Sequence, residues 1–257
     1  MRAYIDMRKA AGAAAATINR ELGLLSSAIS FAKKWWGWKL DNPVKGCLLK
    51  PPKGRVRYLS DDEAVRLFRS AQESKRAPHL PSFIFIALYT GCRLGELLGL
   101  EWSRVDFQNA RIHFEPEHTK DDEARSVPLN DVALAAFEHL KAFRDHFCPK
   151  SPWVFCNRKG MRIASVKTGF RSAVKAAGIV NFRIHDQRHT AASWAINDGA
   201  SLSAVRDMLG HASVKMTEKY AHLAPHKVRE VVSVVGQRGT LLAHPANDAG
   251  VASEDAA

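Results

Sequence analysis

The sequence predicts a mainly α-helical protein with a small antiparallel β-sheet, in which an α+β domain follows a shorter helical one. Three observations predict this class. Apolar residues recur in steps of three and four along most of the chain, as in helices with one buried face. Two short apolar runs joined by a polar turn occupy residues 110–129, a pattern typical of a β-hairpin. A basic, proline-bearing stretch at 49–59 has no periodicity and favours a linker between two domains.

The first domain, residues 1–48, is expected to be built around one long helix over 3–36. Its apolar positions follow helical spacing. They are Ile18, Leu22, Leu25, Ile29 and Ala32. The pattern ends in KKWWGWKLDNPVKG, where glycine and proline interrupt it.

The second domain, residues 60–235, opens with Ser60 and Glu63, which match a helix-capping box. The apolar spacing then predicts a series of short helices. They cover 81–90, 91–100, 130–143, 165–177, 186–198, 202–209 and 213–222. An amphipathic helix fits 223–235, and the tail 236–257, rich in small and polar residues, is expected to be disordered.

The charge balance is strongly basic, with 38 Lys and Arg against 26 Asp and Glu, a net charge of +12. Such a surplus favours a polyanionic partner, nucleic acid first and an anionic membrane second. The alternative is a solvated basic surface without a partner.

The cysteine pattern predicts a reduced, cytoplasmic protein, because no CxxC spacing and no secretory signal accompany it. The four cysteines are Cys47, Cys92, Cys148 and Cys156. The longest apolar run, residues 83–89, is too short to cross a bilayer, so no membrane partner is expected.

The stretch IHDQRHTAAS (184–193) places His185, Arg188 and His189 on one face of a predicted helix. The two histidines have the i, i+4 spacing of a zinc site. Asp186 follows the first histidine where a metalloprotease has glutamate, and the Arg188 charge would repel a dication. No metal is therefore expected on this face, and the residues alone leave open whether it binds a phosphate or no ligand at all.

Four further residues are candidates on their local context. Arg93 lies behind a glycine at the start of a helix, where an anion is favoured, with Glu96 three residues later. Lys120 lies in the polar turn of the hairpin, and His211 follows Gly210 in a turn between helices. Each also has an ordinary interpretation, as a surface ion pair or a solvated side chain. The fourth is Tyr220, on the last helix, and an isolated tyrosine there is more often a core residue.

Taken together, the motifs TGCRLGELLGL, HDQRHT, LGHAS and TEKYAH resemble the tyrosine recombinase (phage integrase) family, in the same order from residue 60 to about 225. The resemblance implies a site-specific recombinase or integrase that cleaves and rejoins double-stranded DNA through a 3′-phosphotyrosine, without a cofactor. The implied catalytic residues are Arg93, Lys120, His185, Arg188, His211 and the nucleophile Tyr220.

Each of these residues has an implied role. Arg93 and Arg188, with His211, would stabilise the charge of the pentacoordinate phosphate. Lys120 would protonate the leaving oxygen, and His185 would be the acid–base partner of Tyr220. Glu96 and His189 would support these groups. The resemblance also implies a homotetramer on DNA, formed through the helix after the tyrosine, and association with the nucleoid.

Two features depart from the family pattern. Gln187 stands where the family usually has leucine, at a position expected to pack inward. The stretch before the linker is too short for all the helices of the family's core-binding domain, so a partial, truncated version of it is expected.

Other functions remain open on the sequence alone. AINDGASLSAVRDMLGH (195–211) is compatible with a helix–turn–helix regulator that binds DNA without cleaving it. A type IB topoisomerase would use similar residues. A recombinase remnant that binds DNA without catalysis is a further alternative.

Overall fold

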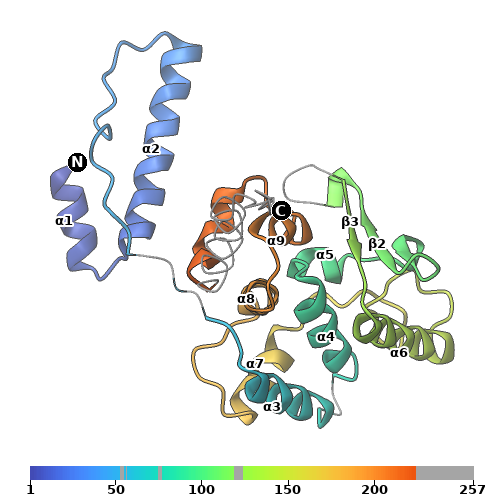
Figure 1. Cartoon of the computed structure of the whole chain (residues 1–257). Helices are drawn as coiled ribbons and strands as arrows, with labels where there is room; N and C mark the ends of the chain where they lie inside the picture. The colour runs from blue at the N-terminus through green and yellow to red at the C-terminus, as the bar shows by residue number, and fades with distance from the viewer. Residues whose placement is uncertain (53–54, 56, 75–76, 119–123, 224–257) are drawn as a thin grey trace, which may run out of the picture. The chain divides into compact units, whose positions relative to one another are not determined.

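The computed structural model describes residues 1–52, 55, 57–74, 77–118 and 124–223. The chain divides into two units, Met1–Arg55 and Val56–Ala257, and the division falls within the stretch assigned to a linker. Lys120, most of the amphipathic segment 223–235 and the tail 236–257 lie outside the described residues. The predicted class, mainly α with a small antiparallel sheet, is confirmed (Figure 1).

The first unit contains two helices, α1 (Arg2–Ala10) and α2 (Ala15–Trp36), so the prediction of one helix over 3–36 is wrong. The chain turns at Gly12, whose φ of 76° lies in the left-handed region that side chains disfavour. Apolar side chains then close a small core between the helices and the segment after them. Its buried members are Ile5, Ile18, Leu22 and Val44.

The second unit is built around α4 (Leu80–Thr90), which is apolar on nearly every face and packs against both α6 and α8. Six further α-helices lie among the described residues of this unit. They are α3 (Asp61–Gln72), α5 (Leu94–Leu98), α6 (Asp131–Phe147), α7 (Lys167–Ala176), α8 (Asp186–Asn197) and α9 (Leu202–Leu209). The capping box forms as predicted, since Ser60 Oγ accepts from the Glu63 amide at 3.3 Å.

The sheet has three antiparallel strands in the order β1–β2–β3, one more than the hairpin that the sequence predicts. They are β1 (Val105–Asp106), β2 (Arg111–Phe114) and β3 (Arg125–Pro128), and Phe114 pairs with Arg125. The two-residue β1 is too short to produce an alternating pattern of its own.

The segment that carries Tyr220 is not the α-helix predicted over 213–222. It forms two 3₁₀ segments, η3 (Val214–Met216) and η4 (Glu218–Leu223). Helix α5 is likewise shorter than the predicted 91–100, because Gly99 ends it. Within the described residues, no helix combines the length and apolarity needed to cross a membrane.

Candidate active site

Two glycine turns form the base of the candidate site. Gly91 ends α4 with φ 63°, and Gly210 ends α9 with φ 62°. A Cβ at Gly91 would lie 2.6 Å from Leu209 Cδ2, so the two turns are in close contact. Helix ends leave carbonyl oxygens without intrahelical partners. The Gly91, Leu209 and Gly210 carbonyls therefore provide acceptors at one place.

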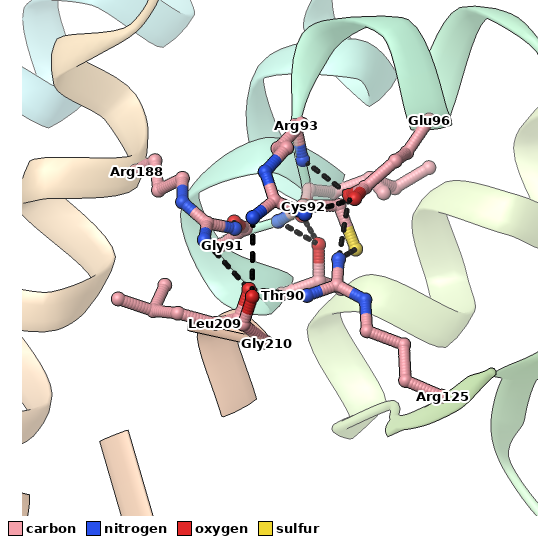
Figure 2. Close-up of polar contacts among 10 residues, drawn as sticks. Thr90, Gly91, Cys92, Arg93, Glu96, Arg125, Arg188, Leu209 and Gly210 are labelled. Carbon is pink, nitrogen blue, oxygen red and sulfur yellow. Dashed lines mark hydrogen bonds and ion pairs between the residues drawn. The ribbon is translucent and has the colours of Figure 1, made fainter. Parts of the chain in front are cut away.

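Arg188 of α8 bridges the two turns (Figure 2). Its Nη1 donates to the Gly91 carbonyl at 2.7 Å, and its Nη2 donates to the Leu209 carbonyl at 2.6 Å. Burial, together with the neighbouring guanidiniums of Arg93 and Arg125, lowers the pKa of Arg188 to about 10. The side chain therefore stays protonated at neutral pH, in an orientation that the backbone fixes.

Arg93 is held against the same turns from the start of α5. Its Nη1 donates to Glu96 Oε1 at 2.9 Å, and its Nη2 donates to the Gly210 carbonyl at 3.1 Å. Glu96 is 6% exposed and also accepts from the Arg93 amide at 2.7 Å. The acidic residue three positions after Arg93 thus orients its guanidinium, as expected from the sequence.

A third guanidinium, that of Arg125 at the start of β3, joins this cluster and was not predicted. Its Nη2 donates to Glu96 Oε2 at 2.5 Å, and its Nη1 donates to the Leu209 carbonyl that Arg188 also contacts. Strand alternation could have revealed it, because Arg125 shares its face with Val127, which is buried.

Three guanidiniums against one carboxylate make this cluster strongly cationic. Figure 2 shows Arg93, Arg125 and Arg188 gathered around the Leu209–Gly210 turn. Fixed arginines favour an oxyanion such as phosphate, because they stay charged and offer two parallel donors. In the described part of the chain, no three His, Cys, Asp or Glu side chains are grouped as metal ligands would be.

Two histidines of the predicted set border the arginines. His211 follows Gly210, and its Nδ1 lies 2.9 Å from Thr217 Oγ1. Partial burial and the Arg188 charge lower its pKa to about 4. His185 lies at the N-terminus of α8, is exposed, and has its pKa lowered by desolvation and then by Arg188. Both imidazoles are neutral at pH 7, so each ring retains one N–H donor.

Tyr220 is held by His189 rather than His185. The Tyr220 hydroxyl lies 2.5 Å from His189 Nδ1, and the tyrosine is only 1% exposed. Burial raises the pKa of Tyr220, so the phenol is neutral. Lys219 Nζ lies 5.0 Å from the centre of the tyrosine ring. His185 contacts His189 edge to face, with 5.3 Å between the ring centres.

Gln187, the departure from the family pattern, is 1% exposed. Within the described residues, neither its amide nitrogen nor its amide oxygen has a hydrogen-bond partner. It lines a cavity of about 120 Å³ together with residues that include Phe83, His185 and Arg188. The expectation that this side chain packs inward agrees with its burial.

The sequence comparisons define the family. Residues 57–227 match the model of the phage integrase family, and the chain belongs to this family. It is 32% identical over 255 residues to the integrase of Salmonella phage P22, covering 93% of this chain and 63% of the relative. It is 31% identical over 209 residues to tyrosine recombinase XerD of Caulobacter vibrioides, covering 76% of this chain and 67% of the relative. The chain thus spans about two thirds of the length of these relatives.

Solved structures share the fold. The Tn1549 transposon integrase in complex with circular intermediate DNA has a TM-score of 0.68 at 21% identity, covering 84% of this chain and 78% of that one. The XerA recombinase has a TM-score of 0.57 at 25% identity, covering 86% and 82%.

Proposed function

We propose that this chain is a site-specific DNA recombinase that cleaves and rejoins strands through a 3′-phosphotyrosine at Tyr220. One observation carries the proposal. Arg93 and Arg188 are fixed by the carbonyls of two adjoining glycine turns, and His211 directly follows one of these turns. This arrangement presents fixed positive charge and an imidazole donor to one ligand, as a phosphodiester requires.

The proposed chemistry follows from the charges. The pentacoordinate phosphate of the cleavage step gathers negative charge, which preorganised donors stabilise better than water does. Arg93 and Arg188 contribute two fixed cations, and the neutral His211 contributes an N–H donor. Lys120 remains the expected proton donor to the leaving 5′ oxygen, on the strength of the family resemblance. His185, exposed beside Arg188, would contact the same phosphate.

The buried tyrosine adds a condition to this reaction. Because Tyr220 is 1% exposed, its hydroxyl has to be uncovered before it can attack a phosphorus atom. The 3₁₀ segment η4 carries this tyrosine, so it is the element that would have to shift. DNA binding therefore includes a rearrangement around Tyr220.

Double-stranded DNA is the proposed partner, supported by the net charge of +12 and by the family. We further propose that residues 60–235 are the catalytic domain and residues 1–48 part of a core-binding domain. Segment 223–235 would join four copies on DNA, and the protein would associate with the nucleoid.

Covalent capture tests this function. A pool of nicked suicide duplexes with a randomised centre and a labelled 5′ end is incubated with the full chain, and denaturing gels reveal adducts. We expect an adduct with the wild type, none with Tyr220→Phe, and at least a tenfold loss with Arg188→Lys, because lysine cannot bridge two acceptors in the same way.

Arg206 of α9, whose side chain is 36% exposed, provides the matched control, and Arg206→Gln should retain the wild-type yield. A chelator should leave the yield unchanged. An adduct that persists with Tyr220→Phe would contradict the assignment of the nucleophile, and reversible binding without any adduct would favour a DNA-binding regulator or an inactive remnant.

A further inference from the structure

His189 and Tyr220 form a pair that the family resemblance does not predict. They come from α8 and η4, 31 residues apart, and the hydroxyl lies 2.5 Å from His189 Nδ1. Among the described residues, His189 is the one hydrogen-bond partner of that hydroxyl. In the resting structure the phenol is shielded from water, so His189 is the acceptor in direct contact with its hydroxyl.

We propose that His189 accepts the proton of Tyr220 in the cleavage step. This inference rests on the proposed function, in which Tyr220 is the nucleophile. It gives His189 the role that the resemblance implies for His185 and leaves His185 beside the phosphate. His189 would then be a catalytic residue, because it touches the reacting oxygen.

The protonation state of the free protein suits this role. Burial, Lys219 of η4 and His185 lower the pKa of His189 to about 4, so the ring is neutral at pH 7. A neutral ring protonated on Nε2 presents a lone pair on Nδ1 to the phenol. The charged groups facing the ring are Lys219, Asp186 and Arg188, of which Asp186 favours the imidazolium.

For the histidine, a bound phosphate would shift the pKa in the required direction. A phosphate held by the arginines brings negative charge close to α8, and negative charge raises the pKa of an imidazole. The Arg188 charge favours the phenolate, since it opposes the rise in the pKa of Tyr220. Proton transfer is therefore disfavoured in the resting protein, where the pKa of the tyrosine is raised and that of the histidine lowered.

The step balances as a two-electron substitution. The Tyr220 O–H bond breaks and its proton moves to His189 Nδ1. The phenolic oxygen bonds to phosphorus while the bond from phosphorus to the 5′ oxygen breaks. The departing oxygen takes a proton from a separate donor, for which Lys120 is the expected residue. Rejoining reverses each transfer, and His189 returns the proton to Tyr220.

Asparagine at position 189 separates proton transfer from positioning. His189→Asn retains a hydrogen-bonding group near the place of Nδ1 but has no basic nitrogen. We expect His189→Asn and His189→Ala to slow adduct formation about 10²–10⁴-fold, the usual contribution of a general base. Imidazole added to His189→Ala should restore part of the rate. The exposed His139 of α6 is the matched control, and His139→Asn should react as the wild type does.

A substrate with a modified leaving group shows whether His189 acts on the nucleophile or on the leaving oxygen. The cleaved phosphate, once mapped with the wild type, is resynthesised with sulfur replacing the 5′ bridging oxygen. Thiolate leaves without protonation, so this substrate should rescue Lys120→Ala. It should not rescue His189→Asn, because the phenol still has to lose its proton.

The outcomes separate the two proposals. If the wild type forms no adduct at Tyr220, the proposed function fails before His189 is tested. If the Tyr220 adduct forms but His189→Asn reacts at the wild-type rate, His189 only positions the phenol and the inference is overturned. Rescue of His189→Asn by the sulfur substrate would also overturn it. Thermal melting of each variant excludes loss of folding, and imidazole rescue provides a second readout for His189→Ala.

Discussion

Arg125 donates a 2.5 Å hydrogen bond to Glu96, a residue 29 positions earlier in the chain. Both side chains are buried, with 11% and 3% of their surface exposed. The same carboxylate holds Arg93 at 2.9 Å, so Glu96 connects β3 to the start of α5. Without this carboxylate, the two guanidiniums would repel each other next to the buried Arg188.

Replacing Arg125 with methionine should therefore destabilise the protein. The substitution leaves Glu96 buried without one of its partners, and breaking a buried ion pair costs about 3–5 kcal/mol. Urea unfolding measures the change. Arg206→Gln, which removes an exposed pair with Asp207, should cost no more than about 1 kcal/mol. Equal losses in the two variants would show that the Arg125–Glu96 contact is not structural.

Alanine at Gly210 should cost more stability than alanine at Gly178. Both glycines have left-handed φ, 62° and 66°, so both variants lose about 1–2 kcal/mol to backbone strain. A Cβ at Gly210 would also collide with the Arg125 guanidinium, whereas nothing lies within 4 Å of one at Gly178. Comparison of the two unfolding free energies isolates the collision. Equal costs would indicate that Arg125 moves aside freely.

Leucine at position 187 should stabilise the fold. The Gln187 amide is buried without partners among the described residues, and such groups cost about 1–3 kcal/mol each. We expect a higher melting temperature for Gln187→Leu, whereas the exposed Gln72→Leu should change stability by about 0.5 kcal/mol or less. A lower melting temperature for Gln187→Leu would mean that the amide has a role that outweighs its burial cost.

Stability should fall as the pH decreases from about 6.5 towards 4. Burial lowers the pKa of His79, His189 and His211 to about 4, against about 6.5 in the unfolded chain. Between these values the unfolded state binds more protons, so acidification favours it. Urea midpoints measured from pH 7 to pH 4.5 test the trend. The slope should be shallower in His79→Phe, and an unchanged slope would contradict the contribution of His79.

Most helices of the second unit could be predicted, and the candidate site residues could be named, because amphipathic spacing and short motifs are local. Gly91 and Gly210 predicted the helix ends next to Arg93 and His211, because glycine is the residue that favours such turns. The break at Gly12 was missed because alanine-rich sequence on both sides continues the helical pattern. The 3₁₀ form of 213–222 was missed because periodicity does not distinguish a short α-helix from tighter turns.

The partners of the site residues could not be predicted, because they are distant in sequence or belong to the backbone. The Leu209 carbonyl has no sequence signature, yet it contacts both Arg125 and Arg188. Arg125 follows a polar turn, and that position alone does not indicate contacts with Glu96 and the Leu209 carbonyl. The pairing of Tyr220 with His189 rather than His185 depends on how η4 lies against α8, which only the tertiary structure specifies.

Identification of the residue joined to DNA tests the central claim most directly. The adduct formed with a suicide duplex is digested with protease and nuclease, and mass spectrometry locates the nucleotide-bearing peptide. Phosphodiester cleavage by this site predicts a single linkage, from the Tyr220 oxygen to a 3′-phosphate. Linkage to another residue, or to a 5′-phosphate, would contradict it.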